Sequence, residues 1–333
     1  MHPTLGRLVL MLALLYGGAL NALAQNSREG YPNRSVKIVV PFSPASSSDN
    51  AARSLTDRLN QRFRQPFIVD NRAGAGGTIG TLAVARSPAD GYTLLLTTSS
   101  PLVINPLIDR TVKYDVEKDL VPVAMLSSGG LLLVSDPALP ARDLPELIAL
   151  LKKNPGKYSY ASNGSGSYSH MAMELFKQMA GVDLVHVPYK GPAQAEADVM
   201  AGQVTLMFDA VATGNEQVKG NRLRAYGISS RKPDPIAPQY TPLADQGVPA
   251  LQNFDVVGWS GLLAPRGTPP KVVDALANAV GDILADPAYR DTMARRGASI
   301  VVPEAMGSMA RQIREDSAKW GALVKSANIR LEP

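Results

Sequence analysis

The sequence predicts an α/β protein with two doubly wound lobes arranged as a hinged clamshell, and three observations support this fold class. The chain has 333 residues, which is enough for two domains that each bury a core. Short apolar strands alternate with helices of 3.6-residue periodicity, the pattern of an α/β fold with largely parallel sheets. Two apolar stretches, 121–134 and 254–263, bracket a middle region with its own strands and helices. The chain therefore crosses between the lobes twice.

The amino-terminal segment, residues 1–24, is predicted to be an export signal peptide. Arg7 supplies a positive charge, residues 8–15 form an apolar run, and residues 22–24 fit an A-x-A cleavage site. The alternative, a membrane anchor, is disfavoured because the apolar run is short and interrupted at 16–18. We expect the mature chain to be exported and soluble, with residues 25–128 and 257–333 forming one domain and 129–256 a second domain inserted into it.

The elements of the first domain follow from local patterns. An apolar strand at 36–40 precedes a serine-rich turn and a helix, whose apolar face is formed by Ala52, Leu55, Leu59 and Phe63. A second strand at 67–69 leads into the glycine-rich segment 73–80 and a helix that ends near Arg86. The pair Asp90-Gly91 predicts a turn before a third strand at 92–97.

The middle region repeats the alternation. Helices are expected at 144–153 and 169–180, and strands at 158–161, 184–187, 204–208 and 225–228. Beyond the second apolar stretch, Thr268-Pro269-Pro270 predicts the cap and start of another helix. A last helix carries apolar residues at helical spacing: Met309, Ile313, Trp320 and Leu323.

The composition excludes several kinds of chemistry. The chain has no Cys, so disulfides, thiolate metal sites and Cys nucleophiles are absent. Only three His are present, and His2 lies in the predicted signal peptide, so a multi-His metal site is not expected. Net charge is +5, without a basic run, which argues against nucleic acid as a partner. No cofactor is expected, because the glycine pattern 74–80 fits the dinucleotide fingerprint only loosely and a nucleotide phosphate loop is missing.

Two polar turns are candidate anion sites, because each follows a strand and opens a helix. Backbone N–H groups and hydroxyls converge there at the positive end of the helix dipole, where a carboxylate or phosphate is favoured. The alternative for the first turn is a simple helix cap by one Ser or by Asp49. Because the turns belong to different domains, we expect them to face each other across a cleft. The candidate residues are Ser46, Ser47, Ser48 and Asp49 in the first turn and Ser162, Asn163, Gly164, Ser165 and Gly166 in the second.

Four further residues complete the candidate site. Lys190 could supply a cation and Tyr189 a hydroxyl, although an ordinary turn with an exposed lysine explains them equally well. Asp209, at a strand end, could receive a ligand ammonium or hydroxyl, or cap the next segment. Ser99, which follows the third predicted strand of the first domain, is the fourth candidate.

Hydrolysis is the enzymatic alternative. No G-x-S-x-G motif is present, since 258–262 fails at its last position, so a nucleophilic serine would have to use His170 or His186. Both are better explained as packed or hydrogen-bonded residues. His170 lies in the first turn of a predicted helix, where the dipole disfavours the imidazolium, and His186 lies in an apolar strand.

The chain resembles the substrate-binding proteins of tripartite tricarboxylate transporters, the Bug family of periplasmic receptors. The resemblance covers essentially the whole mature chain, and the motifs occur in the family's order. They are Val39-Val40-Pro41-Phe42, Asp70-Asn71-Arg72-Ala73-Gly74-Ala75-Gly76-Gly77, Pro88-Ala89-Asp90-Gly91-Tyr92-Thr93-Leu94, Tyr160-Ala161-Ser162-Asn163-Gly164-Ser165-Gly166, His186-Val187-Pro188-Tyr189-Lys190-Gly191, Gly202-Gln203, Phe208-Asp209, Trp259-Ser260-Gly261 and Ala264-Pro265.

The resemblance implies a type II periplasmic-binding-protein clamshell that closes on a small carboxylate: a di- or tricarboxylate, an acidic amino acid or a related organic acid. It also implies a monomeric, non-catalytic receptor that serves a membrane permease or a sensor protein. One departure concerns the first turn, where Ala45 and Ser46 replace the family's glycine pair. Neither residue adopts glycine-specific backbone conformations without strain, so we expect a reshaped loop or a different ligand.

Overall fold

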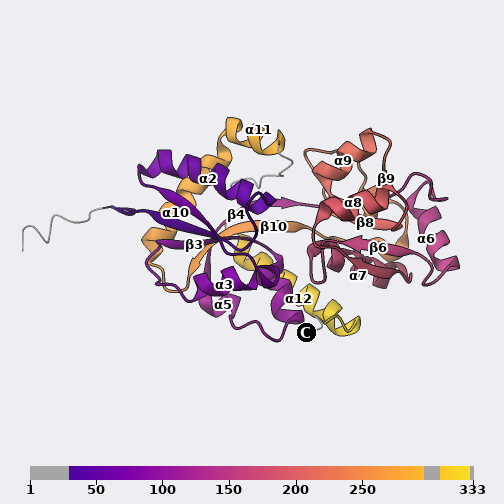
Figure 1. Cartoon of the computed structure of the whole chain (residues 1–333), viewed down its shortest axis with the longest axis horizontal. Helices are drawn as coiled ribbons and strands as arrows, with labels where there is room; N and C mark the ends of the chain where they lie inside the picture. Colours follow the sequence, from indigo (N-terminus) through magenta and orange to yellow (C-terminus); the bar gives the residue numbers. More distant parts are fainter. Residues whose placement is uncertain (1–29, 296–307, 331–333) are drawn as a thin grey trace, which may run out of the picture.

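The computed structural model describes residues 30–295 and 308–330. The predicted signal peptide, 1–24, lies outside these residues. Figure 1 shows two lobes joined by long central strands. Within the described ranges, no helix combines the length and apolarity needed to span a membrane.

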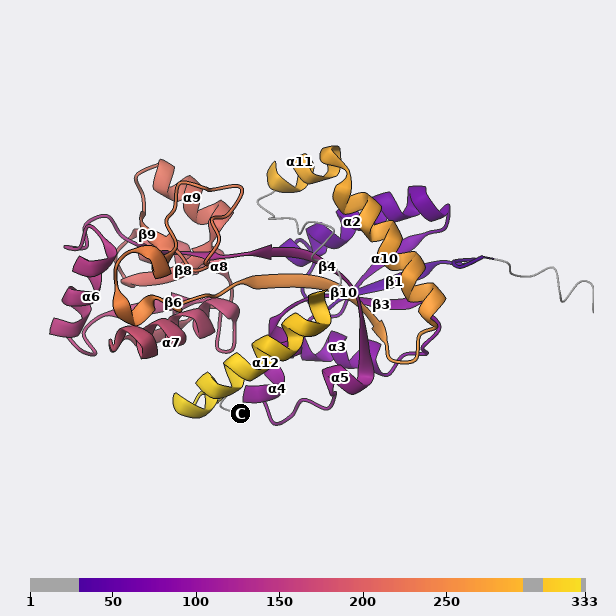
Figure 2. The same ribbon diagram turned by 180° about the vertical axis from the view of Figure 1, so that it is seen from behind.

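Lobe 1 is built on a sheet whose strand order is β2-β1-β3-β10-β4. Its strands are β1 (Val36–Val40), β2 (Phe67–Asn71), β3 (Thr93–Thr98), β4 (Leu120–Gly129) and β10 (Gly258–Pro265). The helices α2 (Ser47–Phe63) and α10 (Pro270–Ala285) lie on one face, and α3 (Thr78–Ala85), α5 (Val116–Asp119) and α12 (Met309–Ser326) lie on the other (Figure 2). Shorter helical segments follow β3, namely η2 (Ser100–Ile104) and α4 (Asn105–Ile108), and η1 (Ala75–Gly77) precedes α3; α11 (Pro287–Arg295) follows α10.

Lobe 2 is built on a second sheet, with the order β7-β6-β8-β5-β9. Its strands are β5 (Leu131–Ser135), β6 (Ser159–Ser162), β7 (Val185–Pro188), β8 (Leu206–Ala210) and β9 (Arg224–Ile228). Its helices are α6 (Leu144–Lys153), α7 (Tyr168–Ala180), α8 (Pro192–Met200) and α9 (Val211–Lys219), followed by the short turns η3 (Leu243–Asp245) and η4 (Pro249–Leu251).

Both sheets are mixed, which corrects the expectation of largely parallel sheets. Strand β1 pairs in parallel with β2 and β3, and β6 pairs in parallel with β7 and β8. The strands next to the crossings, β10 and β5, instead pair antiparallel with both of their neighbours. The chain enters lobe 2 along β4 and returns along β10, so these two strands must run in opposite directions.

The parallel strands explain where the two polar turns lie. The carboxyl ends of β1 and β6 each lead into a turn that opens a helix, α2 in lobe 1 and α7 in lobe 2. In open α/β sheets, ligands bind beyond the carboxyl ends of such strands.

The prediction that Thr268 caps α10 is wrong. The helix begins at Pro270 without a side-chain cap, and the Thr268 hydroxyl donates to the carbonyl of Pro265 at 2.8 Å.

A continuous apolar core joins the lobes on the α12 side. Buried residues of lobe 1, such as Leu102 and Trp320, belong to one cluster with Met171 and Phe176 of α7. The Trp259 indole donates to the buried Asp316 of α12 at 2.7 Å, and Gln178 of α7 donates to Ser326 of α12 at 3.0 Å. The last helix therefore packs on lobe 1 and also contacts lobe 2, as Figure 2 shows from behind.

Candidate functional site

The serine turn of lobe 1, residues 44–49, is stabilised by hydrogen bonds to the carboxylate of Asp49. Asp49 is buried, and its Oδ2 accepts from the Ala45 amide and from Arg53, both at 2.9 Å. Its Oδ1 accepts from Asn71 at 3.0 Å. The hydrogen bond from Arg53 is the main reason that the pKa of Asp49 is lowered. Asp49 is thus an ionised residue whose oxygens are used within the turn.

The three serines of this turn have different roles: Ser46 caps the helix, whereas Ser47 and Ser48 have amide donors that are unbonded within the described residues. Ser46 is the N-cap of α2, since its hydroxyl accepts from the Asp49 amide at 3.2 Å, as the capping alternative expected. Ser47 is exposed and Ser48 is buried. Among the described residues, no acceptor receives a bond from the amides of Ser47 and Ser48. These two amides and their hydroxyls are the groups of this turn that remain available to an anion.

One residue of the turn has a left-handed backbone conformation, although the family's glycine pair is replaced by Ala45 and Ser46. Ala45 has φ +63°, whereas Ser46 is extended at φ −66°. The expected strain is therefore confined to Ala45. A left-handed conformation costs a non-glycine residue on the order of 1 kcal/mol.

We expect Ala45→Gly to raise the free energy of unfolding by about 0.5–1 kcal/mol, because glycine adopts φ +63° without the steric cost. Urea denaturation measures the change. Ala51→Gly is the matched control, since the same substitution inside α2 should lower stability by about 1 kcal/mol. A loss of stability in Ala45→Gly would contradict the left-handed assignment.

The turn of lobe 2, residues 162–167, directs several of its amides inward. The amide of Asn163 donates to Ser169 Oγ at 3.1 Å, and that of Gly164 donates to Ser162 Oγ at 3.2 Å. The amide of Gly166 donates to Nδ1 of His170 at 3.1 Å. Ser167 caps α7 by accepting from the His170 amide. Most polar groups of this turn therefore stabilise its shape.

The remaining donors of this turn lie close together in the chain, around the start of α7. The side chains of Asn163 and Ser165 are exposed. Within the described part of the chain, the amides of Ser165, Tyr168 and Ser169 donate to no acceptor. Tyr168 and Ser169 are the first residues of α7 and Ser165 lies three residues before it, near the helix end where the dipole favours a negative charge.

Asn105 links the lobe-2 turn to lobe 1, a residue that the sequence analysis missed. A Cβ added to Gly166 would lie 2.5 Å from Ile108 Cδ1 and 3.9 Å from Asn105 Oδ1. Asn105 in turn donates to the carbonyl of Gly76 at 3.0 Å. The next glycine, Gly77, has the ring of Phe42 within 3.4 Å of its would-be Cβ. These contacts connect the lobe-2 turn to the segment that enters the serine turn.

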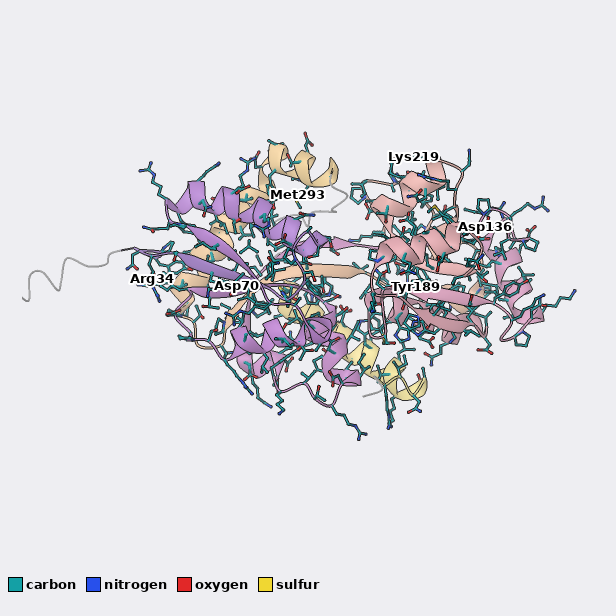
Figure 3. The ribbon with its side chains drawn as sticks, viewed as in Figure 1. Arg34, Asp70, Asp136, Tyr189, Lys219 and Met293 are labelled. Carbon is teal, nitrogen blue, oxygen red and sulfur yellow. The ribbon has the colours of Figure 1, made fainter. Side chains whose placement is uncertain are left out.

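Tyr189, Lys190 and Ser99 have separate environments. The Tyr189 hydroxyl donates to Asp198 at 2.6 Å, and burial raises its pKa to about 12. Lys190 is exposed and bonds to none of the residues that the structure describes. Ser99 is buried at the end of β3, and its amide donates to the carbonyl of Trp259 at 2.9 Å. Figure 3 shows Tyr189 in lobe 2.

Asp209 is a buried acid near a second one. Its carboxyl accepts from the Thr213 hydroxyl at 3.0 Å, and a Cβ on Gly214 would lie 3.2 Å from Oδ2. Burial, and secondly the charge of Glu196, raise the pKa of Asp209 to about 7. Glu196 is itself buried, and its Oε1 has no hydrogen-bond partner among the described residues. Strand β8 runs parallel to β6, with Ala161 paired to Met207, so Asp209 lies toward the same edge of the sheet as the lobe-2 turn.

A hydrolase would need a serine activated by a histidine. Ser162 and His186 are in contact, but they do not form a catalytic arrangement. Ser162 Oγ lies 2.6 Å from Nε2 of His186. Ser162 is fully buried, so a substrate does not reach its hydroxyl. Burial, and then the nearby His170, lower the pKa of His186 to about 4, and no described carboxylate bonds to its ring. The pair is suited to holding a loop rather than to activating a nucleophile.

One surface cavity of the described part of the chain lies away from these turns. It has a volume of about 620 Å³ and is lined by residues that include Asp136, Met200 and Arg222. Figure 3 shows Asp136 on the side of lobe 2 remote from lobe 1. None of the predicted ligand residues lines it.

Comparisons with known proteins agree with the fold and with the motifs. The family described as "Tripartite tricarboxylate transporter family receptor" (TctC) matches residues 51–329. Three solved structures are similar. Rpa4515 of R. palustris with adipate is 31% identical, with TM-score 0.78 and coverage of 90% of this chain and 99% of that one. MatC of Rhodopseudomonas palustris with bound malate is 30% identical, with TM-score 0.76 and coverage of 88% and 100%. The periplasmic binding protein BugD is 32% identical, with TM-score 0.75 and coverage of 91% and 100%.

These similarities confirm the predicted two-lobed α/β fold and the resemblance stated from the motifs. The family is one of receptors, so it gives the hydrolase alternative no support, and it implies a periplasmic location. The chain belongs to the receptor family of the tripartite tricarboxylate transporters.

Proposed function

We propose that this receptor captures a small organic carboxylate between its two lobes and delivers it to the membrane permease of a tripartite transporter. The observation that carries the proposal is the set of unengaged donors at two helix starts, the amides of Ser47 and Ser48 in lobe 1 and those of Ser165, Tyr168 and Ser169 in lobe 2. The adipate and malate in the similar structures are carboxylates of the same kind.

Electrostatics favours a dianionic ligand over a neutral one. Each hydrogen bond from a neutral donor to a charged acceptor contributes about 1.5–3 kcal/mol, and each helix start adds roughly 0.3–1 kcal/mol. A carboxylate at each turn would use both sets of donors without an arginine. In this proposal Asn163 and Lys190 are exposed second contacts, and Ser46, Asp49, Ser99, Ser162, Gly164, Gly166, Tyr189 and Asp209 shape the site.

We further propose where the signal peptide is cleaved and where the two lobes hinge. Signal-peptide cleavage would follow Ala24, the mature receptor would act as a monomer, and the hinge would lie at the domain boundaries 128/129 and 256/257. These boundaries fall at the end of β4 and just before β10, where the chain passes between the two sheets.

Thermal shift with matched ligand pairs tests the proposal. Adipate and malate are compared with adipamide and malamide, which keep the shape but lose both negative charges. We expect at least one diacid to raise Tm by several degrees and its diamide to leave Tm unchanged, because a ligand at 100 times its Kd adds about 2.7 kcal/mol. Native mass spectrometry of protein from its host extends the panel to a co-purified acid. Equal stabilisation by acid and amide would contradict anion capture.

A further inference from the structure

We propose that His170 and His186 are positioning residues of this receptor, a stacked pair that fixes the lobe-2 turn so that its free amides face the ligand. The inference rests on the proposed function, because it assigns those amides to a carboxylate. It concerns two side chains that touch the back of the turn and not the ligand.

Two amides of the turn are tied to this pair. The Gly166 amide donates directly to Nδ1 of His170 at 3.1 Å. The Gly164 amide donates to Ser162 Oγ, which lies 2.6 Å from Nε2 of His186. The two imidazoles stack with ring centroids 4.2 Å apart and planes 16° from parallel. One stack therefore holds both ends of the segment 164–166.

The stack packs against a partly buried polar group formed by Tyr160, Glu174 and Lys177. The ring of Tyr160 lies 4.8 Å from that of His186, and the Tyr160 hydroxyl donates to Glu174 at 2.5 Å. Glu174 also accepts from Lys177 at 2.8 Å. Tyr160 and His170 are both largely buried, so the rings have few alternative positions. These contacts restrict the positions that the two imidazoles can take behind the turn.

A neutral His170 imidazole is required for this role. Nδ1 of His170 accepts a hydrogen bond from an amide, so that nitrogen carries no proton. Burial lowers the pKa of both histidines, which keeps the stacked pair uncharged at neutral pH. A cationic ring would present an N–H to the Gly166 amide instead of a lone pair.

The backbone of the turn explains why it needs holding. Gly164 and Gly166 have φ values of +107° and +76°, and glycine also reaches many other conformations. With their amides bound on the inner side, the intervening Ser165 is left exposed with a free amide. The histidine pair would thus reduce the ordering cost of binding, which is the general benefit of preorganisation.

Amide hydrogen exchange in the unliganded protein tests this directly. In His170→Leu the acceptor for Gly166 is lost, and we expect its amide to exchange at least about tenfold faster, the effect of losing one hydrogen bond. In His170→Asn the side-chain oxygen can take the place of Nδ1, so exchange should stay within about threefold of the parent. NMR of the protein with 15N-labelled glycine resolves this amide without any ligand.

Met173→Ala is the matched control, since Met173 is a fully buried residue on the same helix and makes no bond to the turn. It should lower Tm without selectively accelerating Gly166. Adipate and malate are then titrated, and His170→Leu should weaken binding of whichever diacid stabilises the parent by about tenfold, with rescue in His170→Asn.

Unchanged Gly166 exchange in His170→Leu would overturn the positioning role, whatever the ligand. Equal acceleration in His170→Asn and His170→Leu would also overturn it, because the acceptor atom would then not matter. If the exchange results agree with expectation but no acid binds the parent, the carboxylate proposal fails while the histidines still hold the turn.

Discussion

The Asp209→Asn variant should be more stable than the parent at pH 8, by about 4 kcal/mol. The pKa of this buried carboxyl is raised from 3.8 to about 7, so the folded protein must accommodate an unfavourable charge at pH 8. Asparagine has nearly the same shape, carries no charge and still accepts a hydrogen bond from Thr213.

The sign follows from which state binds the proton. Between pH 3.8 and about 7 the folded carboxyl keeps a proton that the unfolded chain has released, so the stability of the parent falls as pH rises through this range. Below pH 3.8 both states are protonated and the contribution is fully retained. The gain in Asp209→Asn should therefore shrink to about 1 kcal/mol near pH 4.5.

Urea denaturation at pH 4.5 and pH 8 measures both differences. Asp183→Asn is the control, because Asp183 is an exposed acid of the same lobe and its substitution should change stability by no more than about 0.5 kcal/mol at either pH. If Asp209→Asn destabilises the protein at pH 8, the charged carboxyl has a partner in the fold and the burial argument is wrong.

Ser165→Phe should abolish ligand-induced stabilisation, with at least about a 100-fold loss of affinity for the acid that stabilises the parent. The Ser165 side chain is exposed and bonds to none of the described residues, so the unliganded Tm should remain close to that of the parent. A phenyl ring at this position would cover the free amides at the start of α7. A 100-fold loss corresponds to about 2.7 kcal/mol of binding free energy.

Isothermal titration and thermal shift with adipate and malate measure this effect. Gln203→Phe is the matched control, since Gln203 is also exposed on lobe 2 but lies beyond the carboxyl end of α8, just before β8 begins, and is not part of the 162–167 turn. It should bind the acid normally. Parent-like affinity in Ser165→Phe would show that the lobe-2 turn does not bind the ligand.

Local patterns predicted the elements closely but not how they pair. The helix at 144–153 agrees with α6, where Asp143 caps the first turn and the apolar residues face the core. The strand expected at 204–208 begins later, at Leu206, since Val204 packs in the core without joining the sheet. Antiparallel pairing of β5 and β10 was not predicted, because strand periodicity is the same for either direction.

In the candidate site, too, the local pattern was predictable from the sequence but the hydrogen-bond partners were not. The sequence predicted both turns, because serine and glycine between a strand and a helix form a local signal. It could not assign their amides. The acceptors themselves are near in sequence, His170 for Gly166 and Ser162 for Gly164, but both contact His186 of another strand, a contact that no local pattern predicts. Asn105 and Glu196 had no local signal at all, and only their buried contacts make them noticeable.

The sequence by itself determined the α/β alternation, the two helix-opening turns and, through its motifs, the receptor family. Tertiary structure decided which donors stay free, how the histidines hold the lobe-2 turn, and why Asp209 retains a proton near neutral pH. The physical reason is range. Periodicity and turn chemistry act over a few neighbouring residues, whereas burial, hydrogen-bond partners and the pKa values that depend on them arise from contacts between segments far apart in the chain.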